Sequence, residues 1–274
     1  MITGDGAEIW YNLCMNKIRI VFPEYKNEAI KSAVEAAKEK YGEELEVLTA
    51  ESLEEACEKV RDHDADAMVA GIEYTSREVI LACRDIIGVK DLEKTKIFSA
   101  SFVLTRDDEI YVLGDVAACK NPDEEMLYQI VLQTYETAKN VLDDNPRVAM
   151  LSFSTLGSGG DDKSIYQIRN VVNRIHEDYP EIAIDGELQL DAAINEEIGN
   201  KKAPGSTVAG KANVLIAPDL NSGNILYKAM ERFGGFIAAG PILQGFKAPV
   251  SDLSRGSTVE DVLSAIDIEM KMVK

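Results

Sequence analysis

Along the first part of the chain, apolar and polar residues follow two patterns in turn, one typical of β-strands and one typical of amphipathic helices. Residues 17–25, KIRIVFPEY, form an apolar run that ends near a proline, which is typical of a β-strand. The next segment places Ile30, Val34 and Ala37 on one face, as an amphipathic helix does, and ends at Gly42. The strand-then-helix order recurs, which predicts a mostly parallel sheet covered on both faces. The predicted strands are residues 17–25, 45–50 and 65–71, and the predicted helices are residues 27–42, 52–64 and 75–88.

This alternation of strand and helix patterns stops between residues 96 and 115. There, two strand-like runs flank Arg106-Asp107-Asp108 and predict a β-hairpin. A long helix follows, and acids and a proline then interrupt the periodicity near residues 140–146, which indicates a boundary between two lobes. Downstream, the pattern predicts strands at residues 147–155 and 213–219, a strand and a helix within 182–194, helices at 164–179 and 222–234, and an apolar segment at 236–245.

Charge and composition limit the classes of molecule that the chain can bind. The 274 residues carry a net charge of -19, so a nucleic-acid backbone or an anionic membrane would be repelled. A phosphate-bearing ligand must therefore be held by a local cluster of cations and backbone N–H groups. Four scattered cysteines, Cys14, Cys57, Cys83 and Cys119, have no metal-like spacing, and no signal peptide or membrane span is recognisable. We expect reduced thiols in a cytoplasmic protein.

The loop LSFSTLGSGGDDKS, residues 151–164, is the first candidate for binding chemistry. A nucleotide-binding P-loop needs a glycine directly before its Lys-Ser pair, and Asp162 occupies that place. Ser152, Ser154 and Thr155 can still hydrogen-bond an anion or a carbonyl at the start of a helix. The alternative is a strand-to-helix turn with a polar rim, and the loop alone does not decide between them.

A second candidate loop spans residues 201–225. Lys211 precedes a buried-looking strand, and Asn221, Ser222 and Asn224 stand where that strand passes into a helix. Ligands of open α/β sheets bind at the carboxyl ends of strands, which favours a binding role. The alternative is that Asn221 and Ser222 only cap the helix.

The third candidate is PVSDLSRGSTVEDV, residues 249–262. Ser257 with Glu260, or Thr258 with Asp261, makes a capping box, so a helix begins at about residue 258. Arg255 then lies just before the positive end of a helix, which is unfavourable unless an anion binds there. Its guanidinium can hold two phosphate oxygens at once. Asp261 is either a functional acid or only a capping acid.

Four stretches together resemble one enzyme family. DGELQLDAAI, PGSTVAGKANVLIAPDLNSGNILYK, GPILQG and PVSDLSRGSTVEDV, in this order, are similar to the phosphate acetyltransferases and phosphate butyryltransferases. The likeness runs from about residue 64 to the end, and IVFPE resembles the first strand of the family. It implies an α/β fold of two lobes, a three-layer sandwich like isocitrate and isopropylmalate dehydrogenases, with the ligand cleft between the lobes. The first lobe would be residues 1–142 plus about 250–274, and the second residues 143–249.

The resemblance also implies a reaction and its partners. The family converts acetyl-CoA and inorganic phosphate reversibly into acetyl phosphate and coenzyme A, without a metal or other cofactor in the chemical step, usually as a homodimer. By this likeness Asp261 matches the base for the CoA thiol, Ser254 a group that positions the thiol and carbonyl, and Arg255 the cation for phosphate and the developing oxyanion. A thiol of pKa about 8.5 does need a base to become a nucleophile, and a fixed cation acts best where negative charge grows.

Departures from the family leave a second hypothesis open. A segment with a substrate-binding arginine is absent before ADAMVAG, and a second family arginine aligns with Leu81, where Arg77 or Arg84 could substitute. Residues 115–122, DVAACKNP, are longer than the family stretch. The chain is therefore either an active acyltransferase, of undecided acyl preference, or a weak or inactive protein that binds CoA or acyl phosphate. An NAD-dependent dehydrogenase is disfavoured because no GxGxxG follows the first strand.

Overall fold

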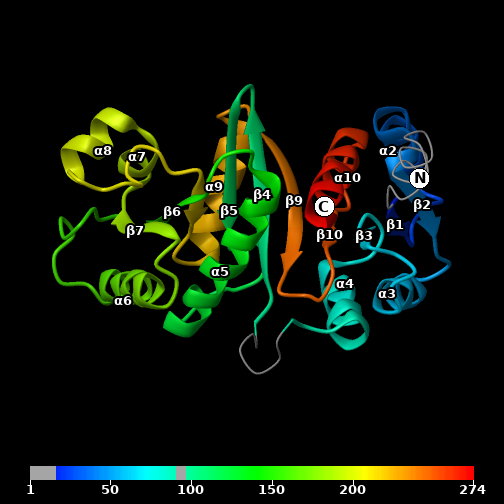
Figure 1. The fold of residues 1–274 in the computed structure, drawn as a ribbon, viewed down its shortest axis with the longest axis horizontal. Helices are drawn as coiled ribbons and strands as arrows, with labels where there is room; N and C mark the ends of the chain where they lie inside the picture. Colours follow the sequence, from blue (N-terminus) through cyan, green and yellow to red (C-terminus); the bar gives the residue numbers. More distant parts are fainter. Residues whose placement is uncertain (1–16, 91–96) are drawn as a thin grey trace, which may run out of the picture.

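A single mixed sheet runs through the computed structural model, which describes residues 17–90 and 97–274 (Figure 1). Its strand order is β2-β1-β3-β10-β9-β4-β5-β8-β6-β7. The strands are β1 Ile18–Phe22, β2 Leu45–Thr49, β3 Ala67–Ala70, β4 Ser99–Arg106, β5 Glu109–Gly114, β6 Arg147–Leu151, β7 Ala183–Leu188, β8 Val214–Ile216, β9 Ile237–Gln244 and β10 Val250–Asp252. Cys14 and the first residue of the predicted hairpin, residue 96, lie outside the described residues.

Helices cover both faces of this sheet, as the alternation of strands and helices predicts. Short turns, η1 Gly42–Glu44 and the π-helical η2 Cys83–Ile87, extend α2 and α4. The helices are α2 Glu28–Tyr41, α3 Leu53–Arg61, α4 Ser76–Ala82, α5 Glu124–Val141, α6 Lys163–Asp178, α7 Leu190–Ile194, α8 Glu196–Lys202, α9 Leu220–Arg232 and α10 Val259–Val273.

Successive residues of each strand face opposite sides of the sheet, so they pack in separate apolar layers. In one half, Ile20 and Val69 pack with α2 and α10, whereas Val21 and Met68 pack with α3 and α4 on the other face. In the other half, α5 and α6 cover one face and α7 and α9 the opposite face. This arrangement is the predicted α/β sandwich, and Figure 1 shows the two halves on either side of β9.

The strands of the two halves run in opposite directions. β10 is parallel to β3 but antiparallel to β9, β9 is antiparallel to β4, and β4 is antiparallel to β5. β5 is in turn parallel to β8, and β8 to β6. The prediction of a mostly parallel sheet therefore holds within each half, while the central hairpin and β9 reverse the direction between them.

The division into lobes at residues 142 and 143 stays a prediction. β4 and β5, which the sequence assigns to the first lobe, are hydrogen-bonded to β9 and β8 of the second. α10 packs on β1, β3 and α2. Among the described residues, no helix is long and apolar enough to cross a membrane.

Candidate active site

A compact turn between β10 and α10 carries Ser254 and Arg255. The backbone N–H of Ser254 donates to the hydroxyl of Ser257 at 3.0 Å, and the N–H of Ser257 donates back to the Ser254 carbonyl at 2.9 Å. The two hydroxyls are 3.3 Å apart. Ser257 thus fastens the turn rather than capping the helix, and it leaves Ser254 and Arg255 exposed.

Arg255 is exposed and forms no hydrogen bond or ion pair within residues 17–90 and 97–274. β10 and β3 are parallel neighbours with Asp252 opposite Ala70, so Arg255 and the segment that leads into α4 follow the same edge of the sheet. The charge of Arg255 accordingly helps to lower the pKa of Glu78, after the larger contributions of the Thr75 backbone and hydroxyl. A guanidinium that is free of protein partners and stands before a helix N-terminus can receive an anion.

Asp261 occupies the third position of α10 and closes a capping box with Thr258. The Thr258 N–H and hydroxyl donate to one carboxylate oxygen of Asp261 at 2.7 and 3.0 Å, and the Asp261 N–H donates to the Thr258 hydroxyl at 3.2 Å. Of the two capping boxes that the sequence allows, this one forms. Only one carboxylate oxygen takes part, so the cap does not occupy the whole acid.

The two substitute arginines have different surroundings. Arg77 is exposed in the first turn of α4, the turn that neighbours Arg255. Arg84 lies in the π-helical turn at the far end of the same helix and pairs with Asp85 at 2.7 Å. Seven residues of helix separate them by roughly 10 Å. The structure therefore places Arg77, and not Arg84, at the end of α4 that is nearer to the turn carrying Arg255.

Two buried acids, Glu24 and Asp252, flank this region, and no neighbouring residue pattern predicts the burial of either. Glu24 accepts hydrogen bonds from the backbone of the turn after β3. Asp252, at the end of β10, is 1% exposed, and its Oδ1 has no hydrogen-bond partner among the described residues. Burial raises the pKa of Asp252 to about 7; the hydroxyl of Ser76 opposes the shift and the charge of Glu24 adds to it.

The loop after β6 uses two of its predicted ligands for its own structure. Ser154 is buried and donates to Glu187 at 2.8 Å, and Thr155 is buried against Gln189, whose N–H donates to the Thr155 hydroxyl at 3.0 Å. These two hydroxyls are therefore not available to a ligand in this structure. Ser152 remains partly exposed.

Glu187 is the anchor of this loop. Its fully buried carboxylate receives two hydrogen bonds from Arg169, at 2.8 and 3.0 Å, and one from the Gly157 N–H at 2.7 Å. Burial alone would raise the pKa of Glu187, but the bonds from Arg169, Gly157 and Ser154 outweigh it and lower the pKa to about 2. The motif DGELQLD contained this acid, but its partners are distant in sequence.

The loop after β8 starts α9 with a cap that sequence reasoning missed. Asp219, not Asn221 or Ser222, is the N-cap, and it accepts from the Ser222 N–H at 2.9 Å. Asn221 and Ser222 are exposed, whereas Asn224 donates to the Val116 carbonyl at 3.4 Å. Asn224 thereby ties α9 to the loop at residues 115–122.

A pocket of about 370 Å³ opens between the loops after β6 and β8. Ser152 and Ser222 both line it, so two predicted residues from separate loops share one pocket. Its floor is mostly apolar. The full lining is Leu151, Ser152, Phe153, Ser164, Ile168, Leu190, Ala217, Pro218, Asp219, Ser222 and Leu226.

Lys211 is not part of this arrangement. It precedes β8, whereas Ser222 follows it, so the two residues lie at opposite ends of the strand. The Lys211 side chain is mostly exposed, and its nearest acid is Glu196 at 3.8 Å. Its role in binding stays a prediction that this position does not favour.

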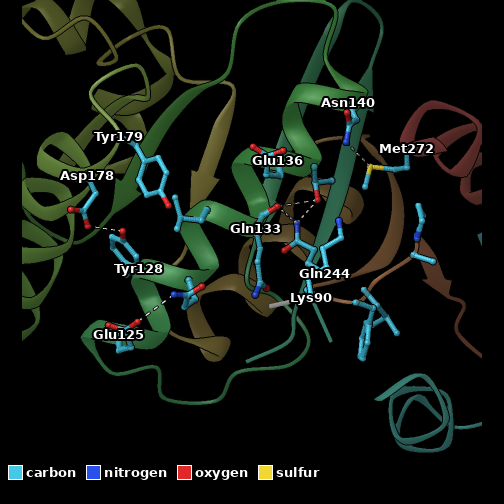
Figure 2. Close-up of a pocket in the computed structure, with 18 of the residues that line it drawn as sticks. Lys90, Glu125, Tyr128, Gln133, Glu136, Asn140, Asp178, Tyr179, Gln244 and Met272 are labelled. Carbon is cyan, nitrogen blue, oxygen red and sulfur yellow. Dashed lines mark hydrogen bonds between the residues drawn. The ribbon is translucent and has the colours of Figure 1, made fainter. Parts of the chain in front are cut away.

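A larger pocket, of about 770 Å³, runs along one face of α5 (Figure 2). None of the predicted site residues lines it, and several of its polar groups are already bonded to one another. The Tyr128 hydroxyl donates to Asp178 and the Gln244 amide to Thr137, both at 2.7 Å. Its size alone does not make it the active site.

The predicted residues thus form two groups. One contains Ser254, Arg255, Asp261 and Arg77, and the other contains Ser152, Ser222, Asn221 and Asn224. No hydrogen bond or ion pair between described residues joins them. Within the described part of the chain, no three His, Cys, Asp or Glu side chains are grouped as metal ligands.

The comparison with protein families decides the relationship. The model of the phosphate acetyl/butaryl transferase family matches residues 8–270. The chain belongs to this family. It is 41% identical over 238 residues to the phosphate acetyltransferase of Treponema pallidum, covering 80% of this chain and 70% of that protein. It is 40% identical over 232 residues to that of Clostridium acetobutylicum, covering 82% and 69%.

Solved structures that are similar to this chain include members of the same family. A phosphotransacetylase from Streptococcus pyogenes is 30% identical, covers 99% of both chains and superposes with a TM-score of 0.84. A β-decarboxylating dehydrogenase from Thermococcus kodakarensis is 13% identical, covers 89% of this chain and 76% of its own, and has a TM-score of 0.51. The second likeness concerns the fold alone and confirms the predicted dehydrogenase-like sandwich.

Proposed function

We propose that the chain catalyses reversible acyl transfer between coenzyme A and inorganic phosphate, with acetyl-CoA and acetyl phosphate as substrates. The relatives that carry this activity in their names support it, and so does the exposed Arg255 beside Ser254 and Asp261, which has no partner among the described residues. The observation that carries most weight is the turn itself: two backbone-fixed hydrogen bonds hold Ser254 and Ser257, and Arg255 projects from it before α10.

Three residues at the turn and the start of α10 have a role in the reaction: Asp261, Arg255 and Ser254. In the direction of acetyl-CoA synthesis, Asp261 accepts the proton of the CoA thiol, and the sulfur attacks the acetyl carbon of acetyl phosphate. The bond between that carbon and the phosphate oxygen breaks, and phosphate leaves with the electron pair. Arg255 stabilises the charge on phosphate and on the carbonyl oxygen, and Ser254 positions the reacting groups.

The second group of residues suits the rest of the coenzyme. We assign Ser152, Asn221, Ser222 and Asn224, with the pocket between their loops, to CoA binding, and Ser154 and Thr155 to holding the loop in shape. Arg77 is the substitute for the family arginine that aligns with Leu81, because it shares a neighbourhood with Arg255. No further cofactor is assigned to the chemical step.

A homodimer in the cytoplasm is part of this proposal. Phe233 is 93% exposed, Ile225 is 68% exposed and Ile237 is 51% exposed, and all three lie on α9 or at its passage into β9. Large exposed apolar side chains on adjoining elements favour an interface between copies. The described cysteines Cys57, Cys83 and Cys119 are unpaired and buried, which supports a reducing compartment.

The deciding experiment measures release of CoA from acetyl-CoA and butyryl-CoA with a thiol reagent, with phosphate, with arsenate and without either. We expect release only with one of these anions, and the ratio of the two rates gives the acyl preference. Arg255→Ala should abolish most of it, whereas Arg232→Ala, at an exposed arginine on α9, should not. CoA binding without anion-dependent release would contradict the proposal in favour of a binding protein.

A further inference from the structure

Glu24 holds the turn that follows β3 through four successive backbone amides. Its side chain is 5% exposed. Oε2 accepts from the N–H of Gly71 at 2.7 Å and of Ile72 at 3.3 Å, and Oε1 accepts from the N–H of Glu73 at 2.5 Å and of Tyr74 at 2.8 Å. Hydrogen bonds to a carboxylate are stronger than neutral ones, and four of them define the path of the turn.

The same turn is packed from its other side by the end of β10. Gly71 has a φ of +103°, and a Cβ at this position would lie 2.4 Å from Asp252 Oδ1 and 2.7 Å from the Leu253 carbonyl oxygen. The Leu253 N–H donates to the Ala70 carbonyl at 2.6 Å. The turn 71–74 is therefore enclosed between Glu24 and the residues that directly precede Ser254.

This turn leads into the part of α4 that faces the catalytic turn. Thr75 and Glu78 close a capping box one residue beyond it, and Arg77 stands between them in the first helical turn. β3 and β10 are parallel neighbours paired as far as Ala70↔Asp252, and the Leu253 N–H donates to the Ala70 carbonyl, so the segments that follow the two strands leave the same edge of the sheet side by side. The position of Arg77 relative to Arg255 thus depends on where Glu24 fixes the backbone of residues 71–74.

We propose that Glu24 is a positioning residue of the phosphate site, an inference that rests on the proposed function. Glu24 contacts no substrate. It acts through the turn 71–74, which sets the first turn of α4 and with it Arg77 against Arg255, so that both guanidinium groups reach one phosphate. This gives a role to the acid of IVFPE, which the sequence pattern placed only at the end of a strand.

The chain offers a matched control for the test. Asp66 receives three hydrogen bonds from Arg19, from its N–H at 2.8 Å, Nε at 3.1 Å and Nη2 at 2.8 Å. Like Glu24, it ties β1 to a segment next to β3, but at the opposite end of the strand. Glu24→Gln and Asp66→Asn both replace an anchoring carboxylate by an amide, and only the first affects the turn that leads to Arg77.

The experiment measures the Kd of inorganic phosphate by titration calorimetry, together with the KM values for phosphate and acetyl-CoA. For Glu24→Gln we expect the phosphate Kd and KM to rise about tenfold, the change that a loss of about 1.4 kcal/mol of binding energy produces, with the acetyl-CoA KM within about twofold. Asp66→Asn should leave all three within about twofold. Circular dichroism and Tm verify folding, and Glu24→Asp replaces Glu24→Gln if the latter does not fold.

The outcomes separate this inference from the proposed function. If the wild-type chain binds phosphate but shows no phosphate-dependent CoA release, the proposed reaction fails and the calorimetric comparison still decides the role of Glu24. Unchanged phosphate binding in the folded Glu24 variant overturns the inference. Equal weakening by Asp66→Asn, or no phosphate binding by the wild-type chain, overturns it as well.

Discussion

Thr258 and Asp261 bind each other's backbone at the start of α10, with the Thr258 N–H on the Asp261 carboxylate at 2.7 Å and the Asp261 N–H on the Thr258 hydroxyl at 3.2 Å. The acid that we assign as the base is thus also a structural cap. Because the bonds to Thr258 use one oxygen of the carboxylate, the other is left for a proton from the thiol.

The two roles of Asp261 can be separated by two variants. Asp261→Asn keeps an acceptor for the cap but cannot take a proton, so we expect turnover to fall by about 10²-fold or more with little change in Tm. Thr258→Ala removes the cap at a cost of about 1 kcal/mol in the free energy of unfolding, with turnover nearly retained. Steady-state rates and thermal melts of both variants check this. A large loss of Tm with unchanged turnover in Asp261→Asn would reduce the acid to a cap.

Arg255 should matter for the reaction and not for the fold. Its side chain is exposed and has no partner within the described residues, so Arg255→Ala should leave Tm unchanged. We expect kcat/KM for phosphate to fall by about a hundredfold, because a charge-assisted bidentate contact contributes a few kcal/mol. Arg255→Lys should recover part of this, since lysine keeps the charge but lacks the planar fork. Equal kcat/KM for the alanine variant and the wild type would remove Arg255 from the mechanism.

Glu187 should contribute stability that depends on its charge. The pKa of Glu187 is lowered from 4.5 to about 2, so the ionised form stabilises the fold above pH 4.5, and this stability is lost as the pH falls towards 2. Glu187→Gln should therefore lower the free energy of unfolding at pH 7 by on the order of 3 kcal/mol. Urea unfolding at several pH values measures the difference from the wild type. The difference should shrink in acid, and a constant difference would mean that packing, not charge, causes it.

Glu269 predicts the opposite pH dependence. Its side chain is fully buried on α10 and accepts from the Ser251 hydroxyl at 2.5 Å, and its Oε2 has no partner among the described residues. Burial raises the pKa of Glu269 from 4.5 to about 8, against the bond from Ser251, so the protonated form stabilises the fold, and this stability declines as the pH rises above 4.5 and is fully lost above about 8. Glu269→Gln should therefore have a higher Tm than the wild type at pH 9, by several degrees. A lower Tm at pH 9 would contradict this.

The local pattern was sufficient where the responsible residues are neighbours in sequence. The strand and helix periods, the hairpin at Arg106 to Asp108 and the Thr258–Asp261 box all depend on residues within about one turn of each other, and all are present. The family motifs extended this to the fold of the chain.

Tertiary contacts account for what the pattern missed. Glu24 and Glu187 meet partners 47 and 30 residues away along the chain, so nothing beside them in the sequence shows that they anchor loops. Ser154 and Thr155 read as ligands because they are polar, but the fold buries them against Glu187 and Gln189. The reversal of strand direction follows from pairing β9 between β4 and β10, which periodicity does not encode.

The backbone ladder of the sheet is not equally strong across its width. β4 and β9 share six registered residue pairs, from Ser99↔Gln244 to Thr105↔Ile237, whereas β9 and β10 share only Val250↔Leu243 and Ser251↔Ile242. Fewer cross-strand bonds therefore resist bending between β9 and β10 than between β4 and β9. Ser254 follows two residues after the end of β10, so any bending at this seam would shift the turn that carries Arg255 relative to β9 and the half of the molecule beyond it.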